Sequence, residues 1–199
     1  FSESKNNIIM QLDCDCVISN QHVYDLYNAL LKMGKKNCIA PVYFTKNTDK
    51  CIHKFPDKKI DFARNLFTSI ICGASYSVMR MGTISKIGNN FGADPEYMVN
   101  DMLKSDWLPG GCVLHYKDDI IFNNYYPFKG KAYCEDLIHS FFLRKNRLDL
   151  WIYKKAFCFT EKPELPVNIS ELNAYFRSFT YFNKLVSGKT KIRFFIWLT

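Results

Sequence analysis

The sequence lacks the motifs that mark several common protein classes. No run reaches the roughly 18 apolar residues that a membrane-spanning helix requires. The longest apolar stretch, residues 66–81, is interrupted by Ser, Gly and Thr. There is no complete Gly-x-x-x-x-Gly-Lys-Ser/Thr phosphate loop and no Gly-x-Ser-x-Gly nucleophile motif. These absences argue against kinase-like and hydrolase-like functions.

The eight cysteines form neither a zinc-finger pattern nor a disulfide framework. Cys14 and Cys16 form a Cys-x-Cys, but no second pair follows at zinc-finger spacing. Most of the others lie within apolar runs, whereas disulfide frameworks are typical of small, loop-rich secreted chains. We therefore expect the cysteines to act as small buried hydrophobes in a reducing compartment, which predicts a cytoplasmic protein.

What is present indicates a folded protein with an anionic partner. The 199 residues suit one domain with a core, and 48% hydrophobic and 16% aromatic residues argue against disorder. Twenty-seven basic and 19 acidic residues give a net charge of +8. This charge favours nucleic acid, a phosphorylated small molecule or an anionic membrane surface, and does not choose among them.

The first 44 residues predict a strand, a helix and a second strand. Residues 7–12 form a short apolar run that ends abruptly at Asp13-Cys14-Asp15, as a buried strand does at a sheet edge. Ser19 or Asn20 is expected to cap a helix that Gly34 ends, and residues 38–44 are rich in β-forming types. This order predicts an α/β fold with a mixed, mostly parallel sheet flanked by helices.

The rest of the chain continues this alternation. We expect one or two helices over 64–85, a polar, turn-rich stretch over 89–106, a strand over 112–116 with Asp118 or Asp119 capping a short helix after it, a helix from Glu135 to about Asn146, and a strand over 148–153. Pro163 and Pro166 mark a linker. The predicted division is therefore a catalytic domain at 1–162 and an aromatic, basic, helical extension at 163–199.

Asp13 and Asp15 are the first candidate site residues. Two carboxylates one residue apart, just past a strand end, can both reach one divalent cation. Their hard oxygens suit Mg²⁺ or Mn²⁺, which in turn bind a diphosphate. The carboxyl edge of the sheet is also where open α/β folds bind ligands. The alternative is a solvated turn, since Asp-x-Asp occurs often by chance.

Two further segments carry candidate residues. Glu135 and Asp136, at a helix start, could supply a general base that the helix N-terminus keeps ionised, or form an ordinary acidic first turn. Gly110 and Gly111 allow a backbone to approach a ligand closely, or form a plain turn before a strand. His139, one turn after the acidic pair, could assist a metal or phosphate, although a surface or core histidine is the simpler interpretation.

These motifs, in this order, resemble those of family-two glycosyltransferases, which are inverting enzymes with the GT-A fold. The stretch NIIMQLDCDCVIS resembles their strand and Asp-x-Asp motif. The stretch WLPGGCVLHYKDDIIFNNYYPFKGKAYCEDLIHSFFLRK resembles their block of paired glycines and an acidic pair. Together the two stretches cover about a quarter of the chain. Within this family, the sequence resembles the enzymes that make bacterial surface polysaccharides.

The resemblance implies a role for each candidate residue. Asp13 and Asp15 would bind Mn²⁺ or Mg²⁺ and the diphosphate of a nucleotide-sugar donor, and Gly110 and Gly111 would form the floor of the donor pocket. Asp136 would deprotonate the acceptor hydroxyl, and Glu135 would orient the base or hold the acceptor. The acceptor would be a glycan or a lipid-linked glycan.

The chain departs from the family at two places. Where the family often has an Arg in the helix after the acidic pair, this chain has Phe142, with Arg144 close by. Only twelve residues precede Asp13, so the nucleotide-binding βαβ half that such enzymes carry before this strand is missing from the sequence. The basic, aromatic stretch 169–199 suits a peripheral contact with the inner face of the cell membrane, or packing on the catalytic domain.

Two other functions remain open from the sequence. A two-metal nucleotidyltransferase also uses paired aspartates at strand ends, but needs a further carboxylate from a neighbouring strand. A basic, aromatic-rich nucleic-acid-binding module suits the charge, but no RNP-like, KH or zinc motif supports it. We therefore expect no nucleic-acid partner.

Overall fold

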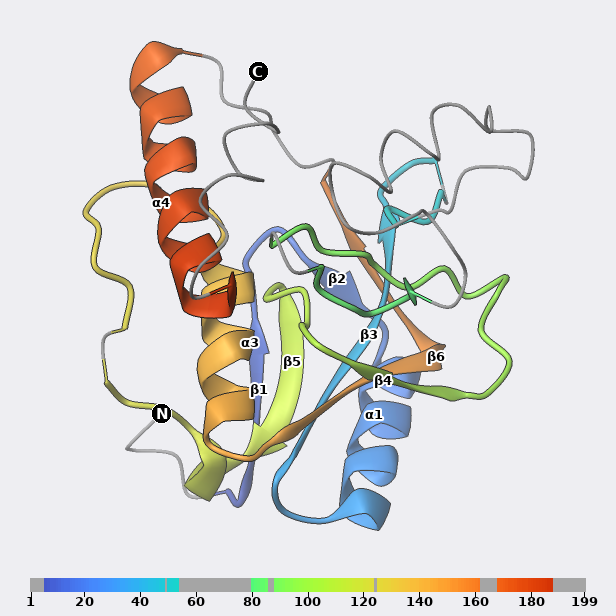
Figure 1. Ribbon diagram of the computed structural model, residues 1–199. Helices are drawn as coiled ribbons and strands as arrows, with labels where there is room; N and C mark the ends of the chain where they lie inside the picture. Colours follow the sequence, from blue (N-terminus) through green and yellow to red (C-terminus); the bar gives the residue numbers. More distant parts are fainter. Residues whose placement is uncertain are drawn as a thin grey trace.

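A curled, mixed sheet of six strands forms the centre of the protein (Figure 1). The structure is a computed structural model, and it describes residues 6–48, 50–53, 80–85, 88–123, 125–161 and 168–187. The strands are β1 (Ile8–Leu12), β2 (Val17–Ile18), β3 (Asn37–Thr45), β4 (Met102–Ser105), β5 (Cys112–Tyr116) and β6 (Asp149–Thr160). The helices are α1 (Asn20–Met33), α3 (Glu135–Lys145), α4 (Ile169–Ser187) and the short 3₁₀ helix η2 (Lys117–Asp119). No helix in these ranges is long and apolar enough to cross a membrane.

The sheet is mixed, as predicted, but the prediction that it is mostly parallel is wrong. Its strand order is β1-β5-β3-β6-β2, with β4 also paired to β6. Among the strands that the structure describes, β3 and β6 alone pair in parallel, and the other four pairings are antiparallel. The predicted strand–helix–strand unit exists, and β1 and β3 run in the same direction because both are antiparallel to β5. However, β5 lies between them, and this insertion replaces the parallel pairing with two antiparallel ones.

The sheet separates two hydrophobic cores, because alternate side chains of a strand face opposite sides. On one side, α1 packs its Leu26 and Leu30 against Ile39 of β3 and Leu114 of β5. On the other side, the neighbouring Cys38 and Val113 join a cluster with Leu143 of α3 and Leu150 of β6. Helix α1 and helix α3 therefore cover opposite faces of the sheet.

Helix α4 packs against α3, away from the sheet (Figure 1). Its Phe182 is fully buried and joins Trp107 and Ile138 in a third cluster. Phe179 is buried as well, so two aromatic residues of the predicted extension pack on the domain. The predicted boundary after residue 162 and the aromatic residues beyond 187 lie outside the described residues.

Most predicted element boundaries in the described ranges are confirmed to within a few residues. Ser19 caps α1 through a hydrogen bond from the His22 backbone N–H, and the helix ends at Gly34 as expected. Strand β6 is longer than predicted, and the two short strands β2 and β4 were not predicted. Asp118 and Asp119 lie within η2 and cap no helix. The helices expected over 64–85 fall largely outside the described residues. Of this range the structure describes 80–85, which form a turn and an isolated β-bridge between Ile84 and Asn90.

We predict that Phe182→Ala lowers the free energy of unfolding by about 3–5 kcal/mol, because it leaves a cavity between α3 and α4. Leu172→Ala on the same helix is the control: Leu172 is 42% exposed, so its truncation should cost no more than about 0.5 kcal/mol. Urea unfolding of both variants measures the difference. Equal, small losses would mean that α4 does not contribute to the stability of the domain.

Candidate functional site

The turn after β1 places Asp13 and Asp15 at an exposed edge of the sheet. The Asp13 backbone N–H donates to the Gly111 carbonyl at 2.8 Å, which joins the end of β1 to the start of β5. The Thr160 hydroxyl, at the end of β6, donates to Asp15 Oδ2 at 3.0 Å. Both aspartates are exposed. Three strand ends thus position the two carboxylates next to each other.

Gly110 lies against the carboxylate of Asp136, the second residue of α3. A Cβ atom built on Gly110 would lie 2.2 Å from Asp136 Oδ1, so any side chain there would displace the carboxylate. The Gly110 backbone N–H donates a hydrogen bond to this carboxylate. A Cβ on Gly111 would similarly lie 2.7 Å from Cys16 Sγ. Both glycines are therefore required by close packing within the protein, next to the site.

One cleft of about 540 Å³ brings most of the predicted residues together. Five of the six predicted residues line it: Asp13, Asp15, Gly110, Gly111 and Asp136. Glu135 does not, and lines a second cavity together with His139. Successive residues of a helix point about 100° apart, so Glu135 and Asp136 face different spaces.

Other residues of this cleft were not predicted from the sequence. Tyr43, Trp107, Lys131, Tyr133, Thr160 and Glu161 line it as well. Tyr43 is buried in β3, and its hydroxyl donates to the Cys112 carbonyl at 3.1 Å. Tyr133 donates to Glu171 of α4 at 3.2 Å. Trp107, Lys131 and Tyr133 lie within the stretch that resembles the family block, but the sequence does not single them out, since each residue reaches the cleft only through the arrangement of strands and loops.

Negative charge is concentrated around the cleft, although the protein as a whole is basic. Partial burial and the charge of Asp15 raise the pKa of Asp13. Partial burial and the charges of Asp136 and Asp13 raise the pKa of Glu135. Burial first, and the neighbouring carboxylates second, therefore disfavour the ionised forms of Asp13 and Glu135. A bound cation would relieve this repulsion.

Asp136 has the largest shift among these carboxylates. Burial and the charge of Asp13 raise its pKa to about 6, against the lowering effect of the Gly110 hydrogen bond. The sequence predicted that the helix N-terminus would favour the charged form. The pKa moves the other way because burial outweighs the helix contribution, yet the carboxylate is still mostly ionised at pH 7. A pKa near the operating pH suits a general base.

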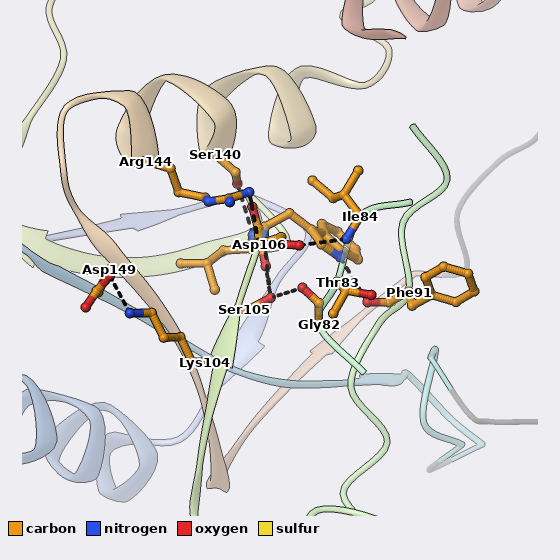
Figure 2. A network of polar contacts seen from close by, with 12 residues as sticks. Gly82, Thr83, Ile84, Phe91, Lys104, Ser105, Asp106, Ser140, Arg144 and Asp149 are labelled. Atoms are coloured by element: carbon orange, nitrogen blue, oxygen red, sulfur yellow. Dashed lines mark hydrogen bonds and ion pairs between the residues drawn. The ribbon is translucent and has the colours of Figure 1, made fainter. Parts of the chain in front are cut away.

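The chain before Gly110 is attached to α3 at regular intervals (Figure 2). Arg144 pairs with Asp106 at 3.0 Å, and the Leu108 backbone N–H donates to Ser140 Oγ at 3.0 Å. With the bond from Gly110 to Asp136, alternate residues 106, 108 and 110 contact every fourth helix residue, 144, 140 and 136. Two extended residues span about 6.6 Å and four helical residues about 6 Å, so the two periods match.

Arg144 therefore has a structural role, because its ion pair with Asp106 joins α3 to the chain before Gly110. In the sequence, Arg144 lies close to the position where the resemblance expects an arginine, but it lines neither the cleft nor the second cavity. It lies in a separate hollow with Lys104 and Asp149, which pair at 2.8 Å (Figure 2). Arg144 is thus directed away from Asp13 and Asp15.

Comparison with known proteins does not place this chain in a family. No protein-family model matches the sequence, and no curated protein is significantly similar to it.

The residues present fit a cation that is shared with a ligand. Among the described residues, no group of three or more His, Cys, Asp or Glu side chains could enclose a metal ion. Mg²⁺ in particular is commonly held by one or two carboxylates together with substrate phosphates and water, and needs no all-protein cage. Asp13 and Asp15, exposed and mutually repelling, are suited to this mode.

We predict that Asp136→Asn stabilises the fold at about pH 8 by about 1–3 kcal/mol and leaves stability unchanged at about pH 3.5. The folded-state pKa is raised above the ordinary value of 3.8, so the ionised carboxylate costs stability above about pH 6. Below pH 3.8 the carboxyl is protonated in both states and this cost is absent. Urea unfolding at the two pH values measures it.

Asp101→Asn is the matched control, because Asp101 is exposed and ion-paired with Lys155. Its substitution should change stability by less than about 1 kcal/mol at either pH. A loss of stability in Asp136→Asn at about pH 8 would contradict the raised pKa.

Proposed function

We propose that this protein is an inverting, metal-assisted glycosyltransferase that transfers a sugar from a nucleotide-sugar donor to a hydroxyl group. The observation that carries the proposal is the meeting of Asp13, Asp15 and Asp136 around one cleft. These residues come from the end of β1 and the start of α3, more than 100 positions apart. The resemblance to family-two glycosyltransferases and the GT-A fold belongs to this proposal.

The donor end of the site is assigned to Asp13 and Asp15. These carboxylates would hold Mn²⁺ or Mg²⁺, which would stabilise the charge that develops on the departing diphosphate. The acidity of the cleft supports a cation-bridged anion over an anion bound directly by the protein. Gly110 and Gly111 would form the floor beneath the donor sugar, because neither carries a side chain into the cleft.

Asp136 is assigned as the base. Its carboxylate would accept the proton of the acceptor hydroxyl while the acceptor oxygen bonds to the anomeric carbon and the bond to the diphosphate oxygen breaks. The pKa of about 6 leaves it ionised at neutral pH and able to accept a proton. Glu135, the neighbour that faces the second cavity, would hold the acceptor.

The two rival functions receive less support from the site. A two-metal nucleotidyltransferase requires a further carboxylate from a neighbouring strand. The neighbour of β1 in the sheet, β5 (Cys112–Tyr116), carries no acidic residue, and Gly110 and Gly111 precede it. A nucleic-acid-binding surface would present cations. The described lining of the cleft instead carries Asp13, Asp15, Asp136 and Glu161, with Lys131 as its basic residue.

Peripheral contact with the inner face of the membrane, and a glycan or lipid-linked acceptor, complete the proposal. Arg177 and Lys184 are exposed on α4, where they could contact anionic headgroups. Ile169 and Leu172 add exposed apolar surface at the start of the same helix. Phe179 and Phe182, in contrast, are buried and contribute to packing.

We predict that Asp15→Asn weakens Mn²⁺-dependent binding of UDP or GDP by more than about tenfold, since losing even an indirect metal contact has this effect. The amide keeps an oxygen for the Thr160 hydroxyl, so the fold should be retained. Calorimetric titration of nucleotide with and without Mn²⁺ measures binding. Asp25→Asn, on α1, is the control and should bind as the parent does. Unchanged binding in Asp15→Asn would remove the metal assignment.

We predict that Asp136→Asn retains nucleotide binding but loses about 10²–10⁴-fold in transfer rate, the usual contribution of a general base. In the parent, the rate should fall as the pH drops below about 6, because the base becomes protonated. Release of nucleoside diphosphate from a panel of nucleotide sugars measures turnover. A rate within a few-fold of the parent would exclude Asp136 as the base, and a larger loss in Glu135→Gln would transfer the role to Glu135.

A further inference from the structure

A second cavity of about 300 Å³ lies between α3 and the strands β1 and β5. Asp136 and Gly110 line both this cavity and the larger cleft, so the two spaces adjoin at these residues. Asp13 and Asp15 line only the cleft, whereas Gln11, Glu135 and His139 line only the cavity. The carboxylate assigned as the base thus faces both adjoining spaces.

The lining of the cavity is part polar and part apolar, and its polar side offers both hydrogen-bond donors and acceptors. Gln11 and Asn123 provide amide groups, and Glu135 and Asp136 provide carboxylates. Tyr125 lines it and forms a hydrogen bond with His139 Nδ1. Its aromatic ring adds an apolar face. Such a mixture of amides, carboxylates and tyrosines is able to bind a molecule with several hydroxyl groups.

No positive charge faces this space from the described residues that line it. None of them is Lys or Arg. Burial lowers the pKa of His139 to about 4, so this side chain is neutral at pH 7. His115, on the same face of β5 as the lining residue Val113, is also held neutral by burial. Its Nδ1 is buried and has no hydrogen-bond partner among the described residues, which marks an unused polar group beside the cavity.

We propose that this cavity binds the acceptor, and that the acceptor presents a neutral saccharide unit there. The inference rests on the proposed function. In an in-line displacement the attacking and departing oxygens lie on opposite sides of the anomeric carbon. If the diphosphate is held at Asp13 and Asp15, the attacking hydroxyl has to approach from beyond Asp136. The cavity opens on that side of Asp136.

The negative charge of the cavity lining favours a neutral saccharide over an anionic one. A uronic acid or a sugar phosphate would place its anion beside Glu135 and Asp136, with no cation in the described lining to offset the repulsion. The hydroxyl groups of a neutral sugar can instead donate to both carboxylates and accept from the amides. The cavity volume, at the lower end of the range for small-molecule sites, suits one monosaccharide unit.

The test is a titration of the isotopically labelled protein by NMR. The neutral probes are methyl β-glucoside, methyl β-galactoside and methyl α-mannoside, and the anionic probes are glucuronate and glucose 6-phosphate. We expect at least one neutral glycoside to shift the backbone amides of residues 121–123 and 135–140, and the anionic probes to bind more weakly. Gln11→Leu should weaken the neutral glycoside about fivefold, the effect of losing one hydrogen bond. Gln21→Leu, on the exposed face of α1, should have no effect.

A charge substitution provides the second variant. Asn123 is exposed at the rim of the cavity, so Asn123→Lys should fold normally and improve glucuronate binding relative to the parent. Anionic probes that bind the parent as tightly as neutral ones would overturn the proposal. So would the absence of any glycoside shift at these amides in a protein that binds UDP with Mn²⁺. Glycoside binding at these amides without any nucleotide binding would support the saccharide site and reject the transferase.

Discussion

The close approach of the Gly110 backbone to the Asp136 carboxylate is the contact on which the site depends. It holds the start of α3 against the chain that enters β5, and it is possible only because residue 110 has no Cβ. The two contacts behind it, Leu108 to Ser140 and Asp106 to Arg144, repeat at the same interval. An extended segment advances about as far in two residues as a helix does in four, so one alignment satisfies all three contacts.

This alignment disfavours the ionised form of Asp136, the residue proposed as the base. Asp136 is placed in a half-buried position near Asp13, which raises its pKa to about 6. Removing that charge would relieve the repulsion, and keeping it makes the group reactive as a base. The protein has a net charge of +8, but the lining of the cleft is acidic. An anionic ligand in the cleft would therefore need a bridging cation, whereas the basic remainder of the surface could attract an anion directly.

Asp136 also lines the second cavity, so its carboxylate faces two spaces. Because α3 turns by about 100° per residue, Glu135 faces the cavity while Asp136 reaches both spaces. Helix α4 stabilises this arrangement from outside, since its Phe182 is buried against Trp107 of the 106–111 segment and Ile138 of α3. This apolar packing thereby helps to fix the orientation of the helix that carries the acidic residues.

The sequence by itself determined the local elements and the candidate acids. Apolar runs, the Ser19 cap and Gly34 bounded β1 and α1 correctly, because these signals act over a few residues. The pairing of β5 between β1 and β3 was decided by tertiary structure, since hydrophobic alternation does not specify which strands become neighbours. The same holds for the use of Arg144, which nearby sequence associates with the acidic pair and which packing directs to Asp106. The separation of Glu135 from Asp136 into different spaces likewise required the helix to be docked against the sheet, because only then do its two faces meet different surroundings.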